Sequence, residues 1–266
     1  MEIAGYFAAL LIGLFLGLIG GGGSILTIPV LVYLFHIPPP LATGYSLFIV
    51  GCSSLAGAWK HHSFGNINLK AAFSFGITSI ITVLLIRKLL LPVLPEELFH
   101  MGSFIVTKSL ATMVLFALVM IIASLQMIRK EAIHQPADQS QSFRLSKALI
   151  RGVEVGILTG LLGAGGGFII IPVLVFSFRL KMKEAIGTSL LIIAMNALCG
   201  FIGDLFHQHF NWWLLLPVTV IAISGTFIGR KLGEKVPGEK LKRGFGWFVL
   251  IMGVYIIIHE LVIRQV

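Results

Sequence analysis

One glycine-rich segment occurs twice in the chain. Residues 17–32 (GLIGGGGSILTIPVLV) return at an offset of 143 residues as 160–175 (GLLGAGGGFIIIPVLV), and positions 13–32 match 156–175 without a gap at 11 of 20 sites. The same offset pairs Gly44 with Gly187, Ser46 with Ser189, Gly57 with Gly200, Asn68 with Asn211 and Arg87-Lys88 with Arg230-Lys231. The chain is therefore one unit used twice, and each copy contains a glycine break.

The composition places this doubled unit in a membrane. Hydrophobic residues make up 57% of the chain and charged residues 12%, and the mean hydropathy is +0.98. A soluble domain carries about 25% charged residues. Apolar runs recur along the whole length, and many reach the roughly 17–25 residues that span a bilayer as helix. They cover 3–20, 41–59, 71–86, 109–128, 155–163, 185–203, 213–229 and 244–263. We predict a polytopic membrane protein without a separate soluble domain.

The formal net charge of +9 does not indicate a nucleic-acid partner. Lys and Arg stand in short clusters between the apolar runs, as topology signals do. The N-terminus lacks a basic region and a cleavage site, so we expect no removed signal peptide. Cys52 and Cys199 fall inside apolar runs, where we expect buried thiols and neither a disulfide nor a metal site.

The expected fold is all-α, with two membrane repeats at 1–128 and 148–266 joined by a polar, cytoplasmic linker at 129–147. Four adjacent glycines at 20–23 end the first helix, and Ser24 is placed to cap the helix that restarts. A proline run at 38–40 is expected to connect to the next helix, and a polar loop to begin at Lys60. The expected helices are 3–19, 24–35, 41–59, 69–86 (stopping at Arg87-Lys88) and 104–128, then 148–163, 167–178, 184–203, 211–229 and 241–263.

Counting positive charge favours an inverted arrangement of the halves. If each glycine-broken pair enters and leaves on one side, each half has three full crossings and the halves are inverted. With the linker cytoplasmic, 16 of the 20 Lys and Arg then lie inside, all except Arg87, Lys88, Lys108 and Arg264. If each broken pair is instead one kinked span, 8 lie inside and 12 outside. The excess of cytoplasmic Lys and Arg in natural membrane proteins favours the first arrangement.

Inverted repeats with helices broken at matching places are typical of secondary transporters. A helix that begins inside the membrane has unpaired N–H groups and a positive dipole end, which favour an anion. Two such starts, at Ser24 and Gly167, would meet at the pseudo-two-fold axis. No Lys or Arg lies at the centre of a predicted span, so we expect backbone amides to hold a small anion. The alternative is that the glycines only permit close helix packing.

The helices at 41–59 and 184–203 carry a second set of candidates. Tyr45 and Ser46 match Thr188 and Ser189, and Cys52, Ser53 and Ser54 lie across from Asn196. These groups either line the pathway or bond to their own helix carbonyls. Asp204, His207 and His209, like Lys60, His61 and His62 in the matching loop, either carry protons or are simply solvated.

The two glycine motifs, each followed by Pro-Val-Leu and then Gly-x-Ser-Leu, resemble the sulfite exporter TauE/SafE family of membrane permeases over nearly the whole chain. The resemblance implies transport, generally outward, of sulfite, sulfoacetate or related organosulfonates across a bacterial inner membrane. It also places the glycine breaks, Ser24, Ser46, Thr188 and Ser189 at the site. The full set of candidate substrate-binding residues is Gly20, Gly21, Gly22, Gly23, Ser24, Tyr45, Ser46, Gly163, Gly165, Gly166, Gly167, Thr188, Ser189 and Asn196.

A secondary transporter or facilitator has four alternatives. The Gly20–Ser24 segment lacks the lysine of a phosphate-binding loop, so ATP hydrolysis is not expected. The sequence has no H-E-x-x-H motif, no G-x-S-x-G motif and no pair of intramembrane aspartates, so an intramembrane enzyme is not expected. No cofactor is expected either. An anion channel and a membrane partner subunit without its own pathway remain as alternatives, and the oligomeric state is left open.

Overall fold

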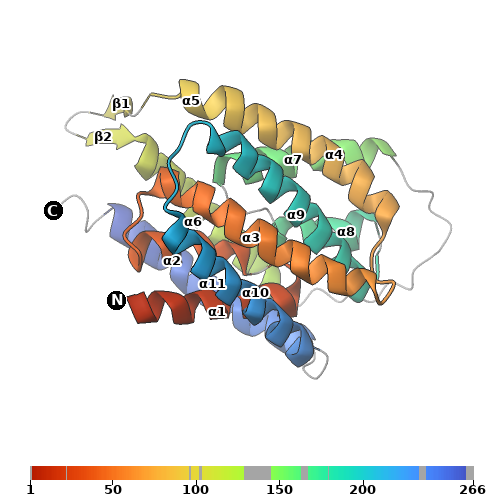
Figure 1. Ribbon diagram of the computed structural model, residues 1–266. Helices are drawn as coiled ribbons and strands as arrows, with labels where there is room; N and C mark the ends of the chain where they lie inside the picture. The colour runs from red at the N-terminus through yellow and green to blue at the C-terminus, as the bar shows by residue number, and fades with distance from the viewer. Residues whose placement is uncertain are drawn as a thin grey trace.

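The computed structural model describes residues 2–21, 23–95, 97–101, 104–128, 145–162, 167–178, 180–233 and 238–261. The first half contains α1 (Glu2–Ile19), α2 (Ser24–Tyr33), α3 (Pro39–His62), α4 (Leu69–Leu85), the π-helical turn η1 (Ile86–Leu90), α5 (Leu91–Val93) and α6 (Lys108–Ile128). The second half contains α7 (Leu145–Leu162), α8 (Gly167–Phe178), α9 (Met182–Leu205), α10 (Trp212–Gly233) and α11 (Gly238–Leu261). The predicted all-α class is confirmed (Figure 1).

The start and end of α3 differ from the prediction. Pro39 and Pro40 begin α3 instead of forming the connection, because proline fits the first helical turn, where its missing N–H would have no partner. The connection lies earlier, after Tyr33, and contains His36 with a φ of 54°. At the other end α3 includes His62, so the expected polar loop is three residues shorter.

Three further boundaries were wrong: α10 runs through Gly233 instead of ending at residue 229, and the other two are the end of α4 and the start of α6. The α4 helix does not stop at Arg87 but continues as η1 through Leu90. The sixth helix begins at Lys108 and not at residue 104, because Phe104–Thr107 forms a strand, β2, paired antiparallel with β1 (Glu97–Met101). The Phe-Ile-Val-Thr sequence of β2 is aromatic and β-branched, which favours an extended backbone.

Helix packing follows the repeat. α3 packs against α9, and α6 packs against α11, so each of these pairs joins equivalent helices of the two halves. α1 packs against α10 just as α7 packs against α4 (Figure 1). Exchanging the halves maps the α3–α9 and α6–α11 contacts onto themselves and converts the α1–α10 contact into the α7–α4 contact. The inverted orientation of the halves in the membrane stays a prediction.

Equivalent glycines make these contacts close. A Cβ on Gly13 of α1 would lie 1.9 Å from the carbonyl oxygen of Ala222 on α10. A Cβ on the equivalent Gly156 of α7 would lie 2.7 Å from the carbonyl oxygen of Ser79 on α4. Small residues at four-residue spacing allow helix backbones to approach in this way. The packing interpretation therefore holds for these glycines.

The helices divide into an interior pair and a lipid-facing set. Among the described residues, four helices are long and apolar enough to cross a membrane: α3, α4 through Leu90, α9 and α10. The most apolar windows of α3 and α9 are 72% and 67% buried, against 33% and 39% for α4 and α10. On α4 the exposed side chains Leu69, Phe73, Ile77, Ile81 and Leu85 recur every four residues.

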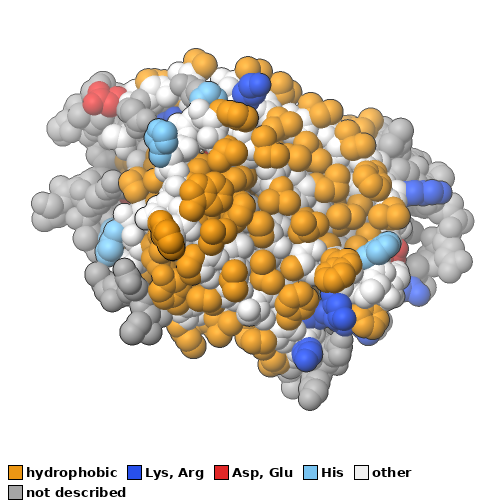
Figure 2. All heavy atoms as spheres, viewed as in Figure 1, with side chains coloured by type: hydrophobic (Ala, Val, Ile, Leu, Met, Phe, Trp, Pro, Cys, Tyr) orange, Lys and Arg blue, Asp and Glu red, His pale blue; other side chains and the backbone are white. Residues whose placement is uncertain are grey.

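The outer surface fits the same division. Figure 2 shows a face covered by hydrophobic side chains, with most of the visible Lys, Arg and His near its margins. The protein is thus a multi-pass membrane protein, and α3 and α9 are the most buried of these four helices.

Candidate functional site

The glycine breaks of the two halves touch each other. A Cβ on Gly21 would lie 2.4 Å from the carbonyl oxygen of Gly167, and a Cβ on Gly167 would lie 2.6 Å from the Cα of Gly21. Gly167 is the first residue of α8, and Gly21 precedes the start of α2 by three residues. The start of α8 therefore contacts the break before α2 backbone to backbone, whereas the predicted meeting of Ser24 with Gly167 at a pseudo-two-fold axis stays a prediction.

Gly20 joins the first break to α9. Its φ is +75°, a conformation that glycine adopts without the strain of a Cβ, and it turns the chain out of α1. Its N–H still donates to Leu16 at 2.7 Å, as the last bond of that helix. Its carbonyl accepts a 2.6 Å hydrogen bond from the Ser189 hydroxyl. Ser189, in the Gly-x-Ser segment of α9, thus supports the first break.

Ser24 does not cap α2 as expected. The N-cap position is Gly23, and no side chain caps it. The Ser24 hydroxyl instead donates backward to the Gly21 carbonyl at 2.7 Å, because Ser24 is already in the first helical turn. The first backbone bond of this turn runs from the Leu26 N–H to Gly23. The N–H groups of Ser24 and Ile25 precede that bond, so they have no acceptor within α2 itself.

The break before α2 also packs closely against α1, because a Cβ on Gly23 would lie 2.1 Å from the carbonyl oxygen of Ile12. Four of the predicted site residues, Gly22, Gly163, Gly165 and Gly166, lie outside the described residues.

Ser46 and Ser189 are equivalent residues on α3 and α9, and both are fully buried. The Ser189 hydroxyl bonds Gly20 and also lies 2.8 Å from the Ile186 carbonyl of its own helix. The Ser46 hydroxyl has no hydrogen-bond partner among the described residues. Buried hydroxyls are normally paired, so Ser46 is a place where a water or a ligand oxygen is expected.

Tyr45 and Thr188 are engaged elsewhere. The Tyr45 hydroxyl accepts a 2.6 Å bond from the Asn211 N–H, just before α10. The equivalent Thr188 hydroxyl accepts a 2.9 Å bond from the Asn68 N–H, just before α4. Both side chains therefore hold the start of a neighbouring helix, and neither is brought to the glycine contact by these bonds.

Asn196 belongs to a group of buried polar side chains in the interior helices. Its Nδ2 donates to the Ser79 hydroxyl at 2.7 Å, while its Oδ1 has no partner among the described residues. Three further hydroxyls of α3 and α7 are buried and similarly unpaired in the described part of the chain: Ser53, Ser54 and Thr159. The interior thus retains hydrogen-bonding capacity that its own side chains do not use.

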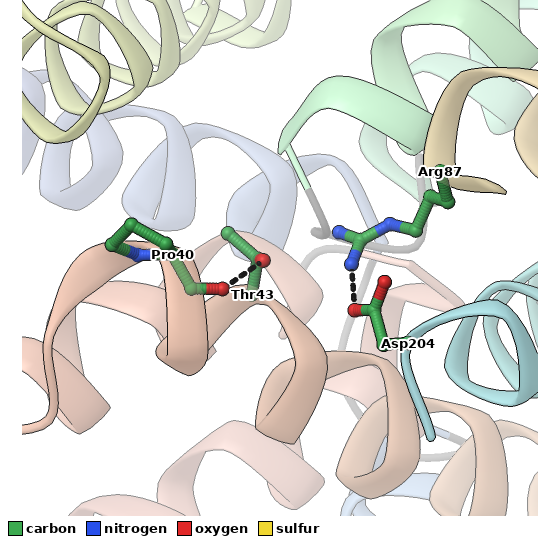
Figure 3. Close-up of polar contacts among 4 residues, drawn as sticks. All are labelled: Pro40, Thr43, Arg87 and Asp204. Atoms are coloured by element: carbon green, nitrogen blue, oxygen red, sulfur yellow. Dashed lines mark hydrogen bonds and ion pairs between the residues drawn. The ribbon is translucent and has the colours of Figure 1, made fainter. Parts of the chain in front are cut away.

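Sequence reasoning missed the most polar buried contact. The Arg87 guanidinium, in η1, forms an ion pair with the Asp204 carboxylate at the end of α9, and their side chains are 1% and 6% exposed (Figure 3). Arg87 was expected outside the span, because the helix was predicted to stop there. The available signal was an Arg and an Asp closing two apolar runs, but only packing shows that these ends meet.

Known proteins resemble this chain along most of its length. A model of the sulfite exporter TauE/SafE family matches residues 6–256. A probable membrane transporter protein of Bacillus subtilis, YdhB, is 30% identical over 232 residues, which cover 87% of this chain and 90% of the relative. One from Xylella fastidiosa is also 30% identical, over 254 residues that cover 93% and 91%. One from Methanocaldococcus jannaschii is 25% identical over 265 residues that cover 93% and 92%.

No solved structure matches the chain at a significant level. The family match and the relatives agree with the repeated glycine motifs and the apolar helices described above. The chain therefore belongs to the sulfite exporter TauE/SafE family of membrane transporters.

Proposed function

We propose that the protein is a secondary transporter or facilitator that exports a small sulfur-containing anion, such as sulfite, sulfoacetate or a related organosulfonate, across a bacterial inner membrane. The observation that carries this proposal is the contact of Gly21 with Gly167. It brings the start of α8 against the break before α2, and the positive ends of two helix dipoles near each other favour a small anion. Ser46 adds an unpaired, buried hydroxyl.

The proposed architecture is that of two inverted repeats, 1–128 and 148–266, with the linker at 129–147 in the cytoplasm. The exchange of helix contacts between the halves supports the repeat, and the distribution of Lys and Arg supports the orientation. In this orientation the ends of α4 and α9, with Arg87 and Asp204, face the outside.

Export of an anion in this orientation needs no pump. At a membrane potential of about 100 mV, moving one negative charge outward releases about 2.3 kcal/mol. A carrier that exposes the site alternately to each side would use this gradient.

The proposal is tested with purified protein in liposomes, by measuring sulfite flux with sulfate and taurine as comparison solutes. We expect saturable sulfite flux that falls about tenfold in Ser46→Ala, because one hydrogen bond to the anion is lost. The matched control is Ser224→Ala, whose hydroxyl is exposed on α10 and bonds its own helix at Val220.

Three outcomes separate the alternatives. Sulfite flux that does not saturate and appears as steps in single-channel recordings would identify an anion channel. No flux of any sulfur anion by folded protein would favour the partner subunit. Equal flux in Ser46→Ala and Ser224→Ala would remove Ser46 from the site.

A further inference from the structure

The guanidinium of Arg87 is buried with most of its hydrogen-bonding capacity unused. Its Nη1 donates to Oδ2 of Asp204. Its Nε and Nη2 are buried and have no hydrogen-bond partner among the described residues. The Thr43 hydroxyl donates to the Pro40 carbonyl at 2.7 Å, and no hydrogen bond joins it to Arg87 among the described residues (Figure 3).

Burying this ion pair costs free energy unless acceptors bind the unpaired N–H groups of Arg87. Burying a charged pair carries a desolvation penalty that is offset only when the remaining N–H groups also find acceptors. A guanidinium has five donors, and a single contact through Nη1 leaves its Nε–Nη2 side unsatisfied. That side presents two parallel N–H groups, which match two oxygens of one oxyanion.

The surroundings of the pair are closely packed, and glycines stand at the tightest places. A Cβ on Gly44 of α3 would lie 3.0 Å from Oδ2 of Asp204, and a Cβ on Gly203 would lie 3.6 Å from the Cβ of Arg87. A Cβ on Gly160 of α7 would lie 2.8 Å from the Cβ of Ile86. Because α7 ends two residues later, at Leu162, the Arg87 turn packs beside the helix that leads into the second glycine break.

We propose that Arg87 is the fixed counter-ion of the transported anion, and that Asp204 holds the guanidinium in place while no anion is bound. This inference rests on the proposed function and specifies its chemistry. The ligand is an oxyanion with at least two oxygens on one atom, as in a sulfonate or sulfite, because a halide offers only one acceptor atom to the two N–H groups. When the anion leaves, Asp204 remains as the partner of the buried positive charge.

The experiment compares Asp204→Asn, Arg87→Lys and the double variant R87Q/D204N with the wild type. Sulfite, sulfate and chloride are added to purified full-length protein, and anion binding is measured from the shift in thermal unfolding and from liposome flux. The double variant replaces the ion pair by two neutral amides, so it contains no unpaired buried charge. The matched control is R230Q, the same change at the equivalent position of the other half.

We expect Asp204→Asn to bind sulfite on the order of tenfold more tightly, because the competing carboxylate is gone. The double variant should lose the sulfite-dependent shift, and its flux should fall on the order of a hundredfold. Arg87→Lys should bind more weakly than the wild type, because a lysine lacks the paired donors. Chloride should give no shift in any variant, and R230Q should behave as the wild type does.

Two results would overturn the inference. One is a double variant that keeps both the sulfite shift and wild-type flux, which would make the pair a structural contact only. The other is a wild type that shows no shift with either oxyanion.

Other results would refute the proposed function without refuting the role of Arg87, or the reverse. A wild type that binds oxyanions through Arg87 but moves no sulfur anion would support the counter-ion and refute export. Sulfite flux that does not depend on Arg87 would do the reverse.

Discussion

At the end of α4, Arg87 is buried against Asp204, whereas the equivalent Arg230 at the end of α10 lies with its guanidinium carbon 4.4 Å from the centre of the Phe64 ring. The residue equivalent to Asp204 by the repeat offset is His61, in the last turn of α3. The helix framework is thus the same in both halves, but the carboxylate occurs in one of them. The two halves thus share their helix packing but differ in the charged residues at these helix ends.

The residues of the two glycine breaks also differ between the halves. Gly21 corresponds by offset to Ala164, and Gly167 corresponds to Ser24. The close contact therefore joins two residues that are not equivalent. Each half contributes one glycine that the other half lacks at the matching place, so the centre of the molecule is asymmetric although the helices around it are not.

The largest expected effect is the loss of one partner of the buried ion pair. Arg87→Ala leaves Asp204 buried and unpaired, which should reduce the free energy of unfolding by about 3–5 kcal/mol. Arg230→Ala removes a cation–π contact of about 0.5–1 kcal/mol. Thermal unfolding and the yield of monodisperse protein in detergent measure both. Equal losses at the two positions would mean that the ends are energetically equivalent.

A second test concerns the contact between the breaks. Gly21→Ala places a methyl group against the Gly167 carbonyl, and we expect a loss of about 1–3 kcal/mol from overpacking. Gly76→Ala on α4 is the matched control, because its Cβ would lie 3.5 Å from Met195 Cε, an ordinary contact. The same unfolding measurement applies. A stable Gly21→Ala would show that the breaks can separate without cost.

The hydroxyls that hold the starts of α10 and α4 should give matched effects. Tyr45→Phe and Thr188→Val each leave one backbone N–H without its acceptor, at Asn211 and Asn68. We expect each to destabilise the protein by about 1 kcal/mol. A large difference between the two shifts in melting temperature would show that the two hydroxyls do not stabilise their helix starts equally.

The smallest expected effect on stability separates Ser46 from Ser189. Ser189→Ala removes the bond to Gly20 and should lower stability by about 1 kcal/mol. Ser46→Ala removes a hydroxyl with no described partner, so stability should stay within about 0.5 kcal/mol of the wild type. Unfolding in the absence of sulfur anions measures both. A destabilised Ser46→Ala would indicate a bond within the protein and would weaken the case for a ligand there.

Much of the fold could be predicted from residue patterns. Apolar runs of spanning length located the helices to within a few residues, because lipid requires every backbone group to be paired inside its own helix. The errors fell at the ends. Prolines 39 and 40 opened α3, and Phe104–Thr107 became a strand, since turn and strand preferences outside the lipid depend on local packing.

The sequence by itself determined the duplicated all-α architecture and the positions of the two breaks, which follow from local composition and an exact offset, and its glycine motifs resemble the family that the comparison showed. Only the tertiary structure decided which groups meet. Ser46 and Ser189 look alike along the chain, but one hydroxyl reaches Gly20 and the other has no described partner. Arg87 and Asp204 are 117 residues apart, and their pairing depends on how the ends of two helices from different halves pack together, which no local pattern encodes.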